Sequence, residues 1–172
     1  MAACSAEEKS QHLVYLRQCL SLACRSPPKP TNFRVGALLV DQRTNSIITT
    51  GYTLELPGNV HAEQCCLSKV AAAHDLPEER VGEVLPDNTV MYSTMEPCGE
   101  RLSGNLPCAE RIVRAKKVRK VVYGVREPST FIKESKGKRM MDQAGIQCVF
   151  VSGLEGEILA TAIEGHKNIL YT

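Results

Sequence analysis

The order of helical and strand-like segments predicts a three-layer α/β/α domain, in which helices cover a mixed central sheet of about five strands. Two observations carry this prediction: five short segments have the composition of strands, and helical patterns alternate with them. At 172 residues, the chain is long enough to bury one sizeable core. Without a visible repeat or composition break, we expect a single domain over 1–172, with its core at about 30–151.

The N-terminal third predicts a helix and then a β-hairpin. The helix covers 6–25, and its apolar stripe is formed by Leu13, Leu16, Leu20 and Ala23, with Val14 beside them. The proline-rich segment 26–30 ends this helix. Segments 33–40 and 46–51 then read as two strands around the polar turn 41–45.

The rest of the chain alternates between helices and strands. An alanine-rich helix over 61–74 is followed by a polar connection at 77–86 and a strand at 89–93. We then expect a short helix at 108–115, a strand at 120–123, a helix at 133–144 stopped by Gly145, and a strand at 147–151. Residues 155–171 are expected to form a C-terminal helix or tail.

Composition argues for an intracellular protein and gives no strong case for a nucleic-acid or membrane partner. A net charge of +2 gives no strong case for nucleic acid, and the basic clusters at 111–120 and 133–139 are typical of solvated helix faces. No apolar run approaches the roughly 20 residues of a membrane span, and the N-terminus lacks the pattern of a signal peptide. We therefore expect eight free thiols and a cytoplasmic location, with the nucleus left open.

The most informative pattern is His61-Ala-Glu63, followed by Pro97-Cys98 and then Cys108. One imidazole and two thiolates are suitable ligands for Zn²⁺, and they leave a fourth tetrahedral position open, as catalytic zinc sites require. We expect Glu63 to carry protons for water that attacks a ring carbon, since zinc lowers the pKa of bound water. Both cysteines precede expected helix starts, where thiolates are favoured. A closed structural site is the alternative, with a fourth ligand from the pair at 65–66.

Several motifs together resemble the riboflavin-biosynthesis deaminases, in particular their stand-alone fungal type. The similarity covers about residues 30–150. It includes Asn32 before the first strand, the element from Gly51 to His61-Ala-Glu63, and the turn at 127–130. The nine residues between Cys98 and Cys108 are the most discriminating feature, because other zinc-dependent nucleobase deaminases have two at this place. The resemblance implies a fold like that of cytidine deaminase.

The resemblance also implies a substrate and a set of contacts. The expected substrate is 2,5-diamino-6-(ribitylamino)pyrimidin-4(3H)-one 5′-phosphate, which loses its 2-amino group as ammonia. A homodimer is implied as well, and the lack of a long apolar run gives no reason to expect a membrane partner. The expected substrate contacts are Asn32, Glu127, Ser129, Asn105 and Arg101, and Arg34 is a further candidate for the phosphate.

Two other interpretations stay open at this point. The chain could be another deaminase of this superfamily that acts on cytidine, deoxycytidylate or tRNA adenosine. It could also be a binding protein with a structural or inactive zinc site. The presence of Glu63 argues against the inactive version, because loss of the proton carrier is the simplest route to inactivation.

Overall fold

The structure, a computed structural model, describes residues 5–127 and 135–166. Its centre is a five-stranded sheet in the order β2-β1-β3-β4-β5. The strands are β1 (Gly36–Asp41), β2 (Ser46–Tyr52), β3 (Thr89–Met95), β4 (Val118–Val125) and β5 (Gln147–Phe150). β1 is antiparallel to both β2 and β3, whereas β3, β4 and β5 are parallel. The predicted mixed sheet is confirmed.

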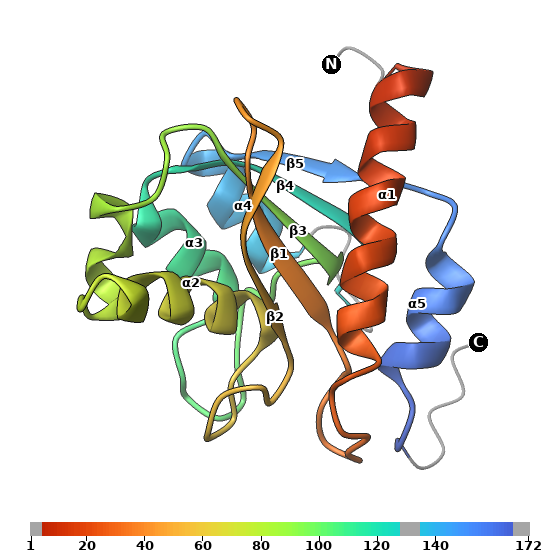
Figure 1. Ribbon diagram of the computed structural model, residues 1–172. Coiled ribbons are helices and arrows are strands. Elements are labelled where there is room, and N and C mark those ends of the chain that lie inside the picture. Colours follow the sequence, from red (N-terminus) through yellow and green to blue (C-terminus); the bar gives the residue numbers. More distant parts are fainter. Residues whose placement is uncertain (1–4, 128–134, 167–172) are drawn as a thin grey trace.

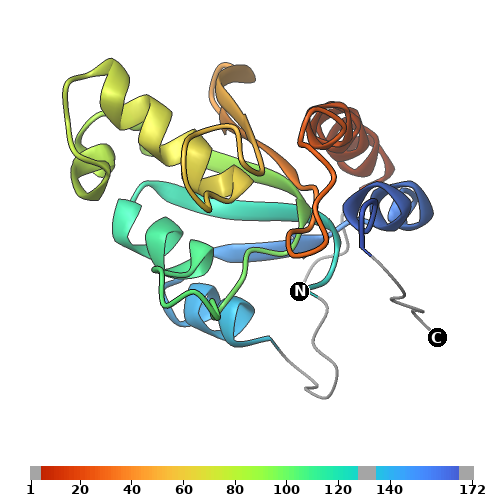
Figure 2. The same ribbon diagram turned by 90° about the horizontal axis from the view of Figure 1, so that it is seen from below.

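Helices cover both faces of this sheet (Figures 1 and 2). On one face lie α1 (Ala6–Ala23) and α5 (Glu155–Ala162); on the other lie α2 (Ala62–Ala73), α3 (Cys108–Ala115) and α4 (Lys136–Gln143). The segment expected to be a polar connection contains a 3-10 helix, η1 (Glu78–Glu83), which packs beside α2 and α3. Every residue of β1 and β3 is buried, as expected for central strands covered on both faces.

The strand directions bring distant parts of the sequence to one edge of the sheet. Because β1 is antiparallel to its neighbours, its start lies beside the ends of β2 and β3: Gly36 pairs with Tyr52, and Ala37 pairs with Ser93. β4 ends at the same edge, because it is parallel to β3. The loops that enter β1 and leave β2, β3 and β4 therefore meet there.

The predicted stripe of α1 is confirmed, since Leu16 and Ala23 are buried and Leu13 and Leu20 pack partly buried against the core, but the helix also buries side chains outside that stripe. Its buried residues are His12, Tyr15, Leu16, Cys19 and Ala23, whereas Val14 is 55% exposed. Two of the buried side chains have polar tips that form hydrogen bonds with residues of the sheet and of its hairpin turn. His12 Nδ1 lies 2.9 Å from the hydroxyl of Tyr92, and the Tyr15 hydroxyl donates to a backbone carbonyl at 3.0 Å. A stripe defined by aliphatic residues alone misses these amphipathic side chains.

The start of the first strand is also corrected, from 33 to Gly36. Before it, Arg34 turns inward and donates to the carbonyl oxygens of Ser26 at 2.8 Å and Cys24 at 2.5 Å. It also forms an ion pair with Glu164, so Arg34 joins the chain segments after α1 and α5 and is not available to a phosphate. Within the described ranges, no helix combines the length and apolarity needed to cross a membrane.

Candidate active site

The site is built where β2, β3 and their loops meet α2 and α3. His61 is the residue before α2, Cys98 follows the end of β3, and Cys108 is the first residue of α3. The close packing of α2 on β2 fixes the first of these positions. A Cβ on Gly51 would lie 2.5 Å from the carbonyl oxygen of Ala62, so only glycine allows this approach.

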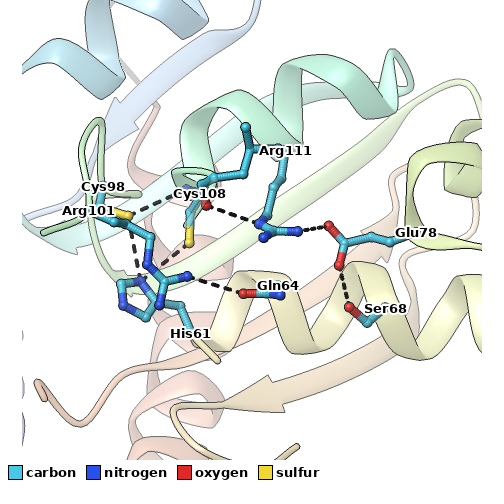
Figure 3. A network of polar contacts seen from close by, with 9 residues as sticks. His61, Gln64, Ser68, Glu78, Cys98, Arg101, Cys108 and Arg111 are labelled. Carbon is cyan, nitrogen blue, oxygen red and sulfur yellow. Dashed lines mark hydrogen bonds and ion pairs between the residues drawn. The ribbon is translucent and has the colours of Figure 1, made fainter. Parts of the chain in front are cut away.

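His61, Cys98 and Cys108 converge on one point, with their ligand atoms all within 4.8 Å of one another (Figure 3). His61 Nδ1 lies 3.5 Å from the Sγ atom of each cysteine. Ligand atoms about 2.1 and 2.3 Å from a shared tetrahedral centre are about 3.5 Å apart, so the spacing fits Zn²⁺. Among the described residues, this cluster contains three ligands and no fourth, which matches an open site.

The neighbouring cysteines are not part of this cluster. Cys65 and Cys66 are buried in α2, and the Cys65 thiol donates to the Tyr52 carbonyl at 3.3 Å. Burial raises the pKa of both thiols, which keeps them neutral. They pack as small apolar side chains, and the alternative of a closed four-ligand site finds no support in the geometry.

The two ligand cysteines interact with each other. A hydrogen bond from the Cys108 thiol lowers the pKa of Cys98 to about 4, and the Cys108 backbone N–H donates to the Cys98 sulfur at 3.4 Å. Thiolate is the form that binds a metal. One sequence expectation is corrected here: Cys108 begins a helix, but Cys98 is followed by an irregular segment. Its thiolate is stabilised by hydrogen bonds instead of a helix terminus.

Glu63 lies beside the cluster on the first turn of α2 and is 4% exposed. Its Oε1 accepts a hydrogen bond of 3.1 Å from the hydroxyl of Ser93, a fully buried residue of β3. Burial raises the pKa of the carboxyl group. Glu63 is therefore a buried, oriented carboxylate next to three metal ligands, and this is suitable for moving protons.

A cavity of about 270 Å³ opens in front of this cluster and reaches Glu63. One wall is the start of the insert between the cysteines, through Glu100, Arg101, Leu102 and Ser103. The other walls come from the loops next to β1, β2 and β4, and they include Asn32, Asn59 and Glu127. A cavity of this kind accommodates a small molecule next to the metal ligands.

Polar contacts connect the walls of this cavity. The side-chain amide of Asn32 donates to Asn59 Oδ1 at 2.8 Å, and Arg101 donates to the Asn59 carbonyl at 2.6 Å and to Gln64 Oε1 at 3.2 Å. On the other side, Glu127 accepts from a backbone N–H at 3.3 Å. Burial, reinforced by the nearby Cys98 thiolate, raises the pKa of Glu127 to about 7.

Of the five expected substrate contacts, three line the cavity: Asn32, Arg101 and Glu127. Asn105, which was also expected there, does not line the cavity: its side chain is exposed, and it follows Gly104, which has a φ of 75°. Ser129 lies outside the described residues.

Sequence reasoning missed three residues that organise this site: Ser93, Asn59 and Gln64. Serine in a buried strand and asparagine after Pro-Gly are common without any function, so no local signal marked the first two. Gln64 carried a signal only through its position, since it directly follows the motif residue Glu63 on the same helix.

One imidazole, two thiolates and a buried glutamate around an open position define the site of a zinc-dependent hydrolytic deaminase. Residues 9–125 match the family model "Cytidine and deoxycytidylate deaminase zinc-binding region". The chain therefore belongs to this family, which confirms zinc as the cofactor and the fold as that of cytidine deaminase.

Named relatives come from riboflavin biosynthesis, as the motif resemblance implied. The chain is 35% identical to the diaminohydroxyphosphoribosylamino-pyrimidine deaminase of Schizosaccharomyces pombe over 90% of its length, and 33% identical to the chloroplastic riboflavin biosynthesis protein PYRD of Arabidopsis thaliana over 92%. It spans only 36% and 33% of those two proteins. The chain is also 54% identical in sequence to Aspergillus oryzae Rib2 deaminase, whose crystal structure was solved in complex with DARIPP. The two structures superpose with a TM-score of 0.85, and the match covers 91% of this chain and 92% of that one.

Proposed function

We propose that this protein deaminates 2,5-diamino-6-(ribitylamino)pyrimidin-4(3H)-one 5′-phosphate in riboflavin biosynthesis, giving the corresponding uracil and ammonia. The observation that carries this proposal is the cavity that leads to Glu63 and the three metal ligands, with the long insert as one wall. The A. oryzae deaminase, which shares 54% of its residues with this chain, is solved with DARIPP bound and supports this choice of substrate.

The reaction replaces an amino group on a ring carbon with oxygen. Zinc held by His61, Cys98 and Cys108 would supply a Lewis acid that lowers the pKa of a water molecule toward neutral pH, so that hydroxide is available for attack. Glu63 accepts a proton from the attacking water and passes it to the ring nitrogen. Glu63 then takes the second proton from the newly added hydroxyl group and delivers it to the amino group, so that the carbon–oxygen double bond forms as the carbon–nitrogen bond breaks and ammonia leaves. Ser93 keeps the carboxylate oriented throughout, because its hydroxyl donates to Oε1 at 3.1 Å.

The cavity walls offer matching groups for the rest of the substrate. Asn32 both donates and accepts hydrogen bonds, as the edge of a pyrimidine requires, and Glu127 accepts from amino or hydroxyl groups. Arg101 is the single lysine or arginine among the described residues of the cavity wall, and two of its N–H groups already hold it in place. We assign the phosphate to Arg101, since a guanidinium has five donors and is suited to phosphate.

Ammonia release from a panel of substrates tests the proposal. The purified zinc protein should act on the ribityl phosphate, prefer it to the ribosyl form, and leave cytidine, deoxycytidylate and tRNA adenosine essentially unchanged. Arg101→Gln should raise KM for the phosphorylated substrate more than for its dephosphorylated form. Efficient turnover of cytidine, deoxycytidylate or tRNA adenosine without the ribityl phosphate would refute the substrate assignment.

We also propose a cytoplasmic homodimer. All seven cysteines of the described residues are free, which agrees with a reducing compartment. The dimer follows from the resemblance to related deaminases, which are usually dimers or larger. Sedimentation of the purified protein and imaging of a fluorescent fusion test these two proposals, and a monomer or an excluded cytoplasmic signal would contradict them.

A further inference from the structure

A chain of polar contacts joins α3, η1 and α2 next to the metal ligands (Figure 3). Arg111 of α3 forms an ion pair with Glu78 of η1, and the other carboxylate oxygen of Glu78 accepts a hydrogen bond from Ser68 of α2. The side chains of Arg111 and Glu78 are only 15% and 18% exposed. Removing one partner of a pair this well shielded from water leaves a buried charge uncompensated and is destabilising, whereas an ion pair on the surface contributes little.

The same arginine also holds the end of the insert between the cysteines. Its Nε donates to the carbonyl oxygen of Leu106 at 3.2 Å, and Leu106 lies two residues before the ligand Cys108. Arg111 itself is one helical turn after Cys108. The guanidinium therefore connects the entry into α3, where the second cysteine ligand sits, to Glu78 and through it to α2.

The beginning of the insert is held on α2 in a similar way. Arg101 donates to the side chain of Gln64, which follows Glu63 on the first turn of α2. It also donates to the carbonyl oxygen of Asn59, in the loop that leads into α2. The two ends of the insert are thus attached to the helix that begins beside His61. A loop fixed at two points loses less conformational entropy when a ligand or metal orders it.

We propose that Arg111 is a positioning residue of the zinc site, acting with Glu78 and Ser68 to hold Cys108 and the insert against α2. The proposal deepens the proposed function, since it rests on zinc binding at the three ligands, but it does not depend on which pyrimidine is deaminated. Groups that orient metal ligands from outside the coordination sphere commonly change metal affinity by about 10–100-fold. For Arg111 we expect the lower end of that range, because its contact is with the backbone two residues before the ligand Cys108 and not with the ligand itself.

The test compares this ion pair with an exposed one on the same helix. Arg111→Gln removes the guanidinium, and the double variant Glu78→Gln with Arg111→Gln also removes the carboxylate left without its partner. The matched controls are Arg114→Gln alone and combined with Glu110→Gln, because Arg114 and Glu110 form an i,i+4 pair on α3 in which the Arg114 side chain is 56% exposed. For each variant, zinc release into excess chelator and the melting temperature with and without zinc are measured.

We expect both Arg111 variants to release zinc about ten times faster than the wild type, with the controls unchanged. The melting temperature should fall further in the zinc-loaded form than in the zinc-free form, because the lost contact acts through the metal site. Should Arg111→Gln not fold, Arg111→Lys takes its place: it retains the charge opposite Glu78 but loses the planar fork that reaches Leu106, and faster zinc release is again expected. Unchanged zinc release, or equal melting shifts with and without zinc, would overturn the proposal and leave Arg111 as a contact of the fold alone.

Discussion

Replacing Glu63 with glutamine separates its chemistry from its structural role. The glutamine is nearly isosteric, and its amide oxygen can still accept the hydrogen bond that Ser93 donates to Oε1 at 3.1 Å. It cannot take up and return a proton. Proton transfer by a positioned group typically contributes about 10²–10⁴-fold, which corresponds to about 2.7–5.4 kcal/mol of activation free energy at about 1.36 kcal/mol for each factor of ten.

The fold and the metal should tolerate this change. Glu63 is 4% exposed, and burying a neutral amide is less costly than burying a charged carboxylate. Glu63 is also not one of the three clustered ligands, so zinc content should stay at one per chain. The Glu63→Gln protein should therefore melt at or above the temperature of the wild type while losing at least about a hundredfold in kcat.

Steady-state ammonia release, metal analysis and a thermal melt on the same preparation check this prediction. Glu83→Gln is the matched control, since Glu83 is an exposed glutamate that pairs with Arg80, far in sequence from the motif. It should retain wild-type kcat. A Glu63→Gln protein that holds its zinc and keeps more than a tenth of wild-type kcat would refute the role of Glu63 as proton carrier.

Three further predictions concern the surroundings of the site. Ser93→Ala removes a hydrogen bond to a charged group, worth about 1.5–3 kcal/mol, so kcat should fall about 10–100-fold with KM little changed, and an unchanged kcat would contradict this. Gly51→Ala would place a Cβ 2.5 Å from the Ala62 carbonyl oxygen. Overpacking of this kind costs about 1–3 kcal/mol of folding free energy, which should lower the melting temperature by about 2–12 °C. An unaltered melting temperature would show that α2 can shift freely. Burial lowers the pKa of His12 in the folded protein, so the neutral imidazole contributes to stability above its unfolded pKa of about 6.5, and this contribution is lost as the pH falls below that value. The melting temperature of His12→Gln should therefore decline less steeply from pH 7 to 5 than that of the wild type, and parallel curves would contradict this.

Much of this architecture could be predicted because its signals are local. Strand composition, helix periodicity and turn residues predicted the five strands and the helices between them. The metal ligands could be proposed because zinc restricts donor type and spacing so strongly. Boundaries set by distant contacts could not be predicted. Phe33 was expected in a strand, but its ring stacks on His166, with centroids 4.9 Å apart, and the His166 imidazole contacts the carbonyl of Asn32 at 2.9 Å.

The substrate contacts were harder to predict for a related reason. Asn105 and Arg101 belong to the same insert and both have hydrogen-bonding side chains, but of the two only Arg101 lines the cavity. The difference arises from the path of the backbone at Gly104 and from the two hydrogen bonds that Arg101 makes with residues near His61. Neither contact leaves a pattern in the sequence of the insert itself.

The strand directions place the metal cluster at one end of the sheet and the β1–β2 hairpin turn at the other. The hairpin turn at 42–45 lies at the end opposite the metal cluster, because β1 begins at the catalytic end and finishes at Asp41. A fluorophore or an affinity tag joined to this turn would be separated from the cavity by the full length of two strands. We therefore expect a label on this turn to report on folding or capture partners without changing substrate access or turnover.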